Sequence, residues 1–155
     1  MVGKKIKMKT KREKAVEIAN KAFAKARYGR HSYMYHLEGV AEMAEKYAVV
    51  NKDDCYIVGI LHDLLEDFPD YMTYMDLLRE FGTDIVISLD FLTKRESESY
   101  MEYIDRCSSN KVAKHVKICD LIFNSQHIFE IMDEFRKINL LERYTQALIF
   151  MVGEK

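Results

Sequence analysis

Apolar positions recur along most of this chain with the spacing of amphipathic helices. Ser32 and Thr73 can cap helices, whereas Tyr28-Gly29 and Phe81-Gly82 can stop them. The pattern predicts helices over about residues 10–27, 32–49, 54–68, 73–81, 84–92, 100–107, 111–126 and 140–152. The third of these carries apolar residues on most of its circumference, so we expect it to be the most deeply buried.

Composition supports a helical fold. The chain has 155 residues, of which 48% are hydrophobic and 32% charged, so it can form one domain with a substantial core. A single proline and six glycines favour helices over a turn-rich β fold. No repeat or linker divides the chain, and we predict an all-α bundle with one domain at residues 10–155.

The net charge of −1 conceals an asymmetry. Residues 1–14 hold seven Lys or Arg and one acid, a charge of +6, so the remainder carries −7. Such an arm could bind nucleic acid or phosphates. No aromatic residues alternate with these lysines, which weakens the nucleic-acid alternative. We interpret residues 1–9 as a solvated, partly disordered basic arm.

Three features concern the compartment. Cys55, Cys107 and Cys119 are odd in number and lack metal-binding or redox spacing, so reduced thiols are expected. The chain has no apolar run near 18 residues and no signal-peptide pattern. We therefore expect a cytoplasmic protein without a membrane partner.

The segment Ile60–Asp67 places polar chemistry inside the most apolar helix. His62, Asp63, Glu66 and Asp67 lie within six residues there. Charged side chains are rarely buried unless they are paired or bind a metal. Two ligands followed by carboxylates one helical turn later suit a metal site with a general acid or base. Such a site needs further ligands from other helices.

Two other helices offer those ligands. Asp120 lies on one predicted helix with Lys117 and Asn124 on the same face, and His36 lies early in another. Separately, His36 fits a hydrogen-bonded core histidine, and Asp120 fits a salt-bridge partner. Together with His62 and Asp63 they make an N₂O₂ set for a divalent transition metal. Spacing alone leaves both interpretations open.

Several motifs in order resemble one family, the HD superfamily of metal-dependent phosphohydrolases. Its name refers to an adjacent His-Asp pair, here His62-Asp63, followed by Glu66-Asp67. The likeness is greatest to the hydrolase domain of RelA/SpoT-type alarmone enzymes and their small single-domain relatives. It covers residues 10–150 and includes the segments Tyr33–Ala41, Leu61–Asp67, Phe81-Gly82, Leu92–Lys94 and Val116–Asn124.

The resemblance implies a role for each candidate residue. His36, His62, Asp63 and Asp120 would bind the metal, most often Mn²⁺ in this family, with Fe, Co, Ni or Zn as alternatives. Glu66 and Asp67 would handle the attacking water. Lys117 and Asn124 would contact phosphate or ribose, and Arg27 would pack against a guanine base.

The function that follows is hydrolysis of a nucleotide, with (p)ppGpp 3′-pyrophosphohydrolase as the leading interpretation. Two alternatives are a 5′-nucleotidase that releases phosphate from nucleoside monophosphates and a non-catalytic nucleotide sensor. Ile122-Phe123 and residues 125–127 differ from the family's more polar residues near the substrate. The sequence does not indicate an oligomeric state.

Overall fold

A computed structural model describes residues 7–130 and 133–153 of the chain. Within these residues the structure is helical apart from one short hairpin, which confirms the predicted all-α class. The elements are α1 Lys11–Ala22, β1 Arg27–Tyr28, β2 His31–Ser32, α2 Tyr33–Lys46, α3 Lys52–Leu61, α4 Leu64–Asp67, α5 Tyr74–Phe81, α6 Thr83–Leu92, α7 Tyr100–Cys107, α8 Lys111–Gln126, η1 Ile128–Glu130 and α9 Glu134–Val152.

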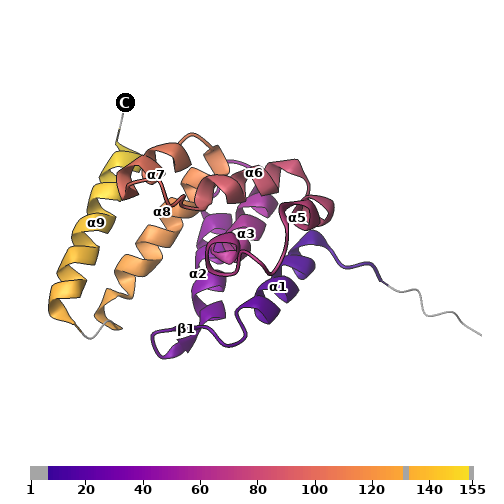
Figure 1. Ribbon diagram of the computed structural model, residues 1–155, viewed down its shortest axis with the longest axis horizontal. Coiled ribbons are helices and arrows are strands. Elements are labelled where there is room, and N and C mark those ends of the chain that lie inside the picture. The colour runs from indigo at the N-terminus through magenta and orange to yellow at the C-terminus, as the bar shows by residue number, and fades with distance from the viewer. Residues whose placement is uncertain (1–6, 131–132, 154–155) are drawn as a thin grey trace, which may run out of the picture.

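Helix α3 lies at the centre of the bundle, as its apolar sequence predicts. It contacts α1, α2, α6 and α8, while α9 packs beside α7 and α8 at one end (Figure 1). Six of its ten residues are buried, including Ile57, Ile60 and Leu61. Apart from Ile128, the buried apolar side chains of the described residues form a single cluster around this helix.

Two glycines allow the helices around the site to approach closely. A Cβ atom at Gly59 of α3 would lie 2.7 Å from the backbone Cα of Ala41 on α2. A Cβ atom at Gly39 of α2 would lie 2.1 Å from the ring of Phe123 on α8. Real Cβ atoms do not make contacts this short, so both positions need glycine for α2 to pack against α3 and α8.

The predicted third helix is not continuous. Helix α3 ends at Leu61, His62 and Asp63 form a turn, and α4 begins at Leu64. The Nδ1 atom of His62 lies 2.7 Å from the carbonyl oxygen of Gly59. This side-chain bond occupies a carbonyl near the end of α3, where the regular backbone ladder stops. His62 and Asp63 therefore lie in a turn between two helices, although both keep right-handed helical backbone angles.

Other boundaries also differ from the sequence prediction. The first helix ends at Ala22 instead of Arg27, and the residues that follow form an antiparallel hairpin that was not predicted. Gly29, with a φ of +56°, begins its two-residue turn. The last helix begins at Glu134 instead of residue 140. Its cap residue, Asp133, accepts hydrogen bonds from the backbone N–H groups of Phe135 and Arg136.

Other expectations have mixed outcomes. Thr73 forms a capping box with Asp76, as expected, whereas Ser32 occupies the cap position of α2 without a side-chain bond. Residues 1–6 of the predicted basic arm lie outside the described residues, so the boundary at residue 10 stays a prediction. Along the described stretches, every helix is too short or too polar to reach across a lipid bilayer.

Candidate metal centre

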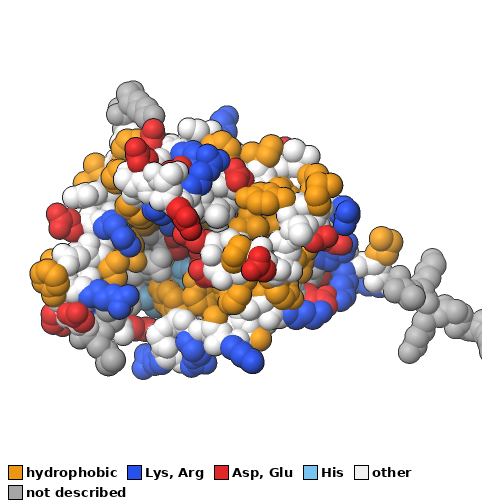
Figure 2. All heavy atoms as spheres, viewed as in Figure 1, with side chains coloured by type: hydrophobic (Ala, Val, Ile, Leu, Met, Phe, Trp, Pro, Cys, Tyr) orange, Lys and Arg blue, Asp and Glu red, His pale blue; other side chains and the backbone are white. Residues whose placement is uncertain are grey.

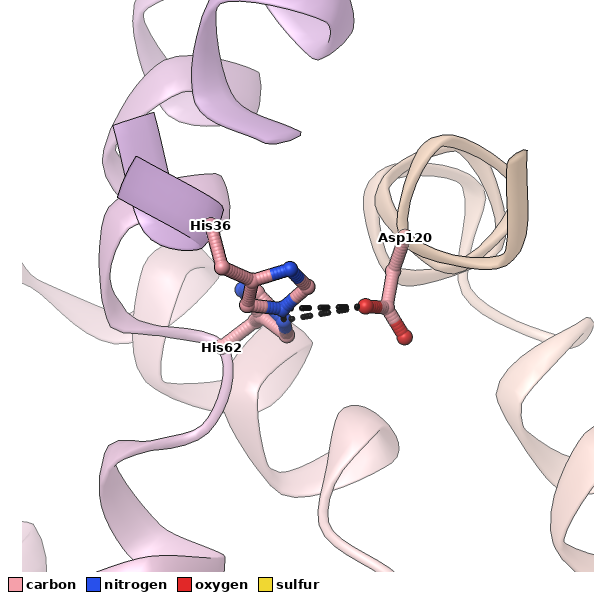
Figure 3. A group of neighbouring side chains, drawn as sticks. All are labelled: His36, His62 and Asp120. Atoms are coloured by element: carbon pink, nitrogen blue, oxygen red, sulfur yellow. Dashed lines mark hydrogen bonds and ion pairs between the residues drawn. The ribbon is translucent and has the colours of Figure 1, made fainter. Parts of the chain in front are cut away.

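Four side chains from three parts of the bundle converge at one point. His36 comes from the first turn of α2, His62 and Asp63 from the turn after α3, and Asp120 from the middle of α8. His36, His62 and Asp120 are buried, and their closest ligand atoms all lie within 4.8 Å of one another (Figure 3). The structure thus brings together all four residues predicted as metal ligands.

The distances within this cluster suit a single ion. The Nε2 atom of His36 lies 3.2 Å from Oδ1 of Asp120, 3.3 Å from Nε2 of His62 and 3.5 Å from Oδ2 of Asp63. Nε2 of His62 lies 3.2 Å from Asp63 Oδ2 and 3.4 Å from Asp120 Oδ1. An ion about 2.1 Å from each atom separates neighbouring ligands by roughly 3.0–3.4 Å in octahedral or tetrahedral geometry. The two-nitrogen, two-oxygen donor set therefore fits a divalent transition metal.

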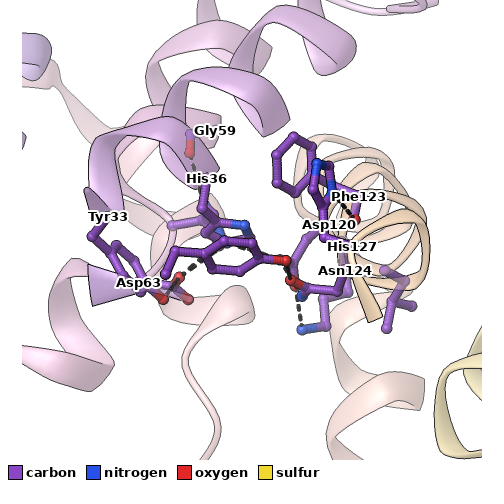
Figure 4. Close-up of polar contacts among 12 residues, drawn as sticks. Tyr33, His36, Gly59, Asp63, Asp120, Phe123, Asn124 and His127 are labelled. Atoms are coloured by element: carbon purple, nitrogen blue, oxygen red, sulfur yellow. Dashed lines mark hydrogen bonds and ion pairs between the residues drawn. The ribbon is translucent and has the colours of Figure 1, made fainter. Parts of the chain in front are cut away.

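Surrounding groups orient three of the four side chains. The Gly59 carbonyl can only accept a hydrogen bond, so Nδ1 of His62 donates to it and Nε2 faces the cluster. The hydroxyl of Tyr33 donates to Oδ2 of Asp63 at 2.7 Å. Asp120 accepts from Lys117 Nζ at 2.8 Å and from Asn124 Nδ2 at 3.0 Å, one turn before and after it on α8 (Figure 4).

The cluster is strongly polarised in the protein without an ion. Burial alone would raise the pKa of Asp120, but Lys117 and the two histidines hold it well below its usual value. Burial alone would lower the pKa values of His36 and His62, but the carboxylates of Asp63 and Asp120 raise both. Both histidines therefore hold a proton more tightly than a free imidazole does, and a bound cation would compete with that proton.

Three members of the cluster, His36, Asp63 and Asp120, line a cavity of about 340 Å³. Figure 2 shows a hollow with histidine atoms at its bottom and both signs of charge around its rim. Glu66 and Asp67, predicted to handle water, line this cavity beside Asp63. Burial and the Asp63 carboxylate raise the pKa values of both groups, which makes each a stronger proton acceptor once ionised.

The predicted substrate residues are divided by the structure. Lys117 and Asn124 line the cavity. Arg27 is exposed on β1, does not line the cavity and donates a hydrogen bond to the carbonyl of Arg30. Its proposed contact with a base stays a prediction and would need the side chain to leave that carbonyl.

Sequence reasoning missed other residues that line the cavity. Two are cations, Lys94 and Arg143, and the guanidinium of Arg143 lies 4.6 Å from the ring centre of Tyr100. Tyrosines supply most of the aromatic wall, at positions 28, 33, 100, 103 and 144. Of these residues, only Tyr33 and Lys94 lie in the sequence motifs that resemble the HD superfamily. A cavity that combines these cations, aromatic walls and the cluster of candidate metal ligands can hold a phosphorylated aromatic ligand.

Comparisons with known proteins agree with this geometry. The model of the HD domain family matches residues 33–138, which include all four ligand positions. A solved structure of a metazoan ortholog of SpoT, described as hydrolysing ppGpp and acting in starvation responses, superposes with a TM-score of 0.80. It is 18% identical in sequence, and the match covers 94% of this chain and 88% of that one, so the likeness is one of fold. The comparison with curated proteins gives no match.

Proposed function

The chain belongs to the HD domain family of phosphohydrolases, and we propose that it hydrolyses a nucleotide with a divalent metal, (p)ppGpp being the leading substrate. One observation carries the proposal. Each candidate histidine lies 3.2–3.5 Å from both candidate aspartates, and His36, Asp63 and Asp120 line a cavity together with Glu66, Asp67 and Lys117. A purely structural cluster has no need of two further carboxylates at the cavity wall.

The residues of the chain divide the chemistry among them. His36, His62, Asp63 and Asp120 would hold the divalent cation, which would lower the pKa of a bound water and neutralise charge on a phosphate oxygen. Glu66, with its raised pKa, is placed to take the proton of the attacking water, and Asp67 lies beside it. Lys117 is held by Asp120 as an ammonium, because that carboxylate raises the pKa of Lys117 although burial opposes it. Lys94 and Arg143 supply further positive charge for a second phosphate.

The alarmone interpretation rests on the motifs and on the cavity cations. A 3′-pyrophosphate on the metal would place one phosphate near Lys117 and leave Lys94 and Arg143 for others. The solved SpoT ortholog supports the fold and leaves the substrate of this chain to be tested.

The position of Arg27 favours the runner-up, a nucleotidase that releases single phosphates. Without an arginine at the base, the tyrosine walls could hold any nucleobase by stacking. The third interpretation, a nucleotide sensor, requires binding without turnover.

One assay separates the three. Protein reconstituted with Mn²⁺ is incubated with ppGpp, pppGpp, AMP and dAMP, and pyrophosphate and phosphate are detected separately. Pyrophosphate with GDP left from ppGpp supports the alarmone hydrolase. Phosphate from AMP or dAMP with ppGpp intact establishes the nucleotidase. Binding of a nucleotide without either product establishes the sensor.

Arg27→Ala then tests the base contact. If Arg27 stacks on guanine, KM rises and kcat stays nearly unchanged, because ground state and transition state lose equal binding. An unchanged KM assigns the base to the tyrosine walls. Arg30→Ala is the matched control, since it removes a neighbouring exposed arginine of the same hairpin.

A further inference from the structure

The two histidines of the cluster are oriented in different ways. Nδ1 of His62 donates to the Gly59 carbonyl, which fixes the ring. Nδ1 of His36 is buried and has no hydrogen-bond partner among the described residues. Histidines that bind metals normally have their second ring nitrogen held by an acceptor, because this bond sets the ring's orientation. Something other than a hydrogen bond must therefore orient the ring of His36.

The ring of Tyr28 lies against His36. The two ring centres are 4.7 Å apart and the planes differ by 11°, a stacked arrangement. Phe123 and Tyr33 meet the same imidazole edge-on, at 5.4 Å each. Tyr28 thus covers one face of the His36 imidazole. This stacking limits rotation of the imidazole about the bond that joins it to Cβ.

The hydroxyl of Tyr28 reaches the cluster by a second route. It donates to Oδ1 of Asn124 at 2.7 Å, and Nδ2 of Asn124 donates to Oδ1 of Asp120 at 3.0 Å. A carboxylate can only accept, so the amide must turn its nitrogen toward Asp120 and its oxygen toward Tyr28. That Asp120 oxygen is the one that also faces His36 and His62. A hydroxyl on the hairpin consequently holds the amide that aims a carboxylate of the cluster.

We propose that Tyr28 is a positioning residue of the metal centre, acting on His36 through its ring and on Asp120 through Asn124. The proposal rests on the metal site of the proposed function and is independent of the substrate. In this proposal the role of the hairpin is to position Tyr28, because β1 places this tyrosine against α2 and α8. Tyr28 contacts one candidate ligand, His36, and the hydrogen-bond partner of another, Asn124. Its removal should therefore weaken metal binding.

Two substitutions separate the two routes. Tyr28→Phe keeps the ring and removes the hydroxyl, whereas Tyr28→Leu removes both. Metal-free protein is titrated with Mn²⁺ alone, and the Kd is measured by calorimetry. Tyr28→Phe should weaken Mn²⁺ binding about 10-fold and Tyr28→Leu about 100-fold, the range found when groups that orient metal ligands are removed. Tyr144→Phe is the matched control, because this tyrosine lines the same cavity without a hydrogen bond to the ligands described here.

A double-mutant cycle tests whether the hydroxyl acts through Asn124. In an Asn124→Ala background, Tyr28→Phe should cause no further loss of Mn²⁺ affinity, because the bond that it removes is already gone. The Tm of the metal-free variants is measured in parallel. If Tyr28→Phe causes a general packing defect, it should lower the Tm of the metal-free protein, also in the Asn124→Ala background. If Tyr28 positions the metal centre, the substitution should mainly reduce the increase in Tm that Mn²⁺ causes.

The outcomes are distinct. Equal Kd values for the wild type and Tyr28→Phe overturn the hydroxyl route, and equal values for Tyr28→Phe and Tyr28→Leu overturn the ring route. A loss of the same size with and without Asn124 also overturns the hydroxyl route. Wild-type protein that binds Mn²⁺ but hydrolyses no nucleotide refutes the proposed function and leaves this inference standing. Wild-type protein that does not bind Mn²⁺ overturns both.

Discussion

Replacing Asp120 by asparagine tests the electrostatics of the cluster most directly. Asp120 is 4% exposed and accepts from Lys117 and Asn124 while facing both histidine Nε2 atoms. Asparagine preserves the shape but has one acceptor oxygen instead of two. Whichever way its amide turns, the NH₂ group faces another donor, and the Lys117 ammonium loses its counter-charge.

The expected loss of stability comes from the uncompensated ammonium of Lys117. The side chain of Lys117 is 15% exposed, and its ion pair with Asp120 is 2.8 Å long. Removing one partner of a buried ion pair costs about 3–5 kcal/mol. For a chain of this size, each kcal/mol lowers the Tm by about 2–4 °C. The Tm of metal-free Asp120→Asn should therefore fall by about 6–20 °C.

The assay is thermal unfolding at pH 7.5 with a chelator, so that lost metal binding does not contribute. Lys117→Met in the Asp120→Asn background removes the uncompensated charge at similar length, and it should restore most of the lost Tm. Asp84→Asn, at an aspartate in the first turn of α6, is the matched control and should leave the Tm within about 2 °C, as for a surface substitution. A double variant no more stable than Asp120→Asn alone would refute the assignment of the cost to Lys117.

Three further predictions address activity, pH and packing. Glu66→Gln should lower kcat by about 10²–10⁴ with metal content unchanged, whereas Glu42→Gln, at an exposed site on α2, should not; near-normal turnover of Glu66→Gln would exclude it as the general base. In metal-free protein the protonated histidines, whose pKa values are raised by folding, contribute their full stability below about pH 6.5. The ionised aspartates, whose pKa values are lowered by folding, contribute theirs above about pH 4. Stability should thus decline above pH 6.5 with a chelator but not with Mn²⁺, and parallel Tm profiles would contradict the linkage. Gly59→Ala, whose Cβ would meet Ala41, should cost about 1–3 kcal/mol in denaturant unfolding, and a smaller loss would mean that α2 shifts to make room.

Hydrophobic periodicity predicted most of the helices and the central position of α3. It succeeded because α2, α3 and α8 bury continuous apolar faces, which leave a strong signal at helical spacing. The same rule failed for α9, whose first turns place Phe135 and Ile138 in solvent. An exposed apolar residue contradicts the inward pattern, so the sequence suggested a later start.

The candidate ligands could be named from the sequence because the motifs occur in order and each carries a residue type that the chemistry requires. Their geometry was not available. His62 and Asp63 approach the cluster from a turn that breaks the expected helix, and the bond from His62 to Gly59 depends on a local conformation that periodicity does not encode. The motifs therefore named these four candidates, although the expected helix that carries two of them is interrupted by a turn.

Tertiary packing alone decided what surrounds the ligands. Tyr28 and Arg27 are neighbours on a two-residue strand, yet Tyr28 stacks on His36 while Arg27 stays in solvent. Lys94 and Arg143 meet in one cavity although 49 positions separate them in the sequence. A strand this short has no detectable period, and contacts between segments distant in the sequence arise only when the helices pack together. The sequence by itself determined most of the helices and the candidate metal ligands, whereas the packing of these segments determined the groups that orient those candidates and form the cavity.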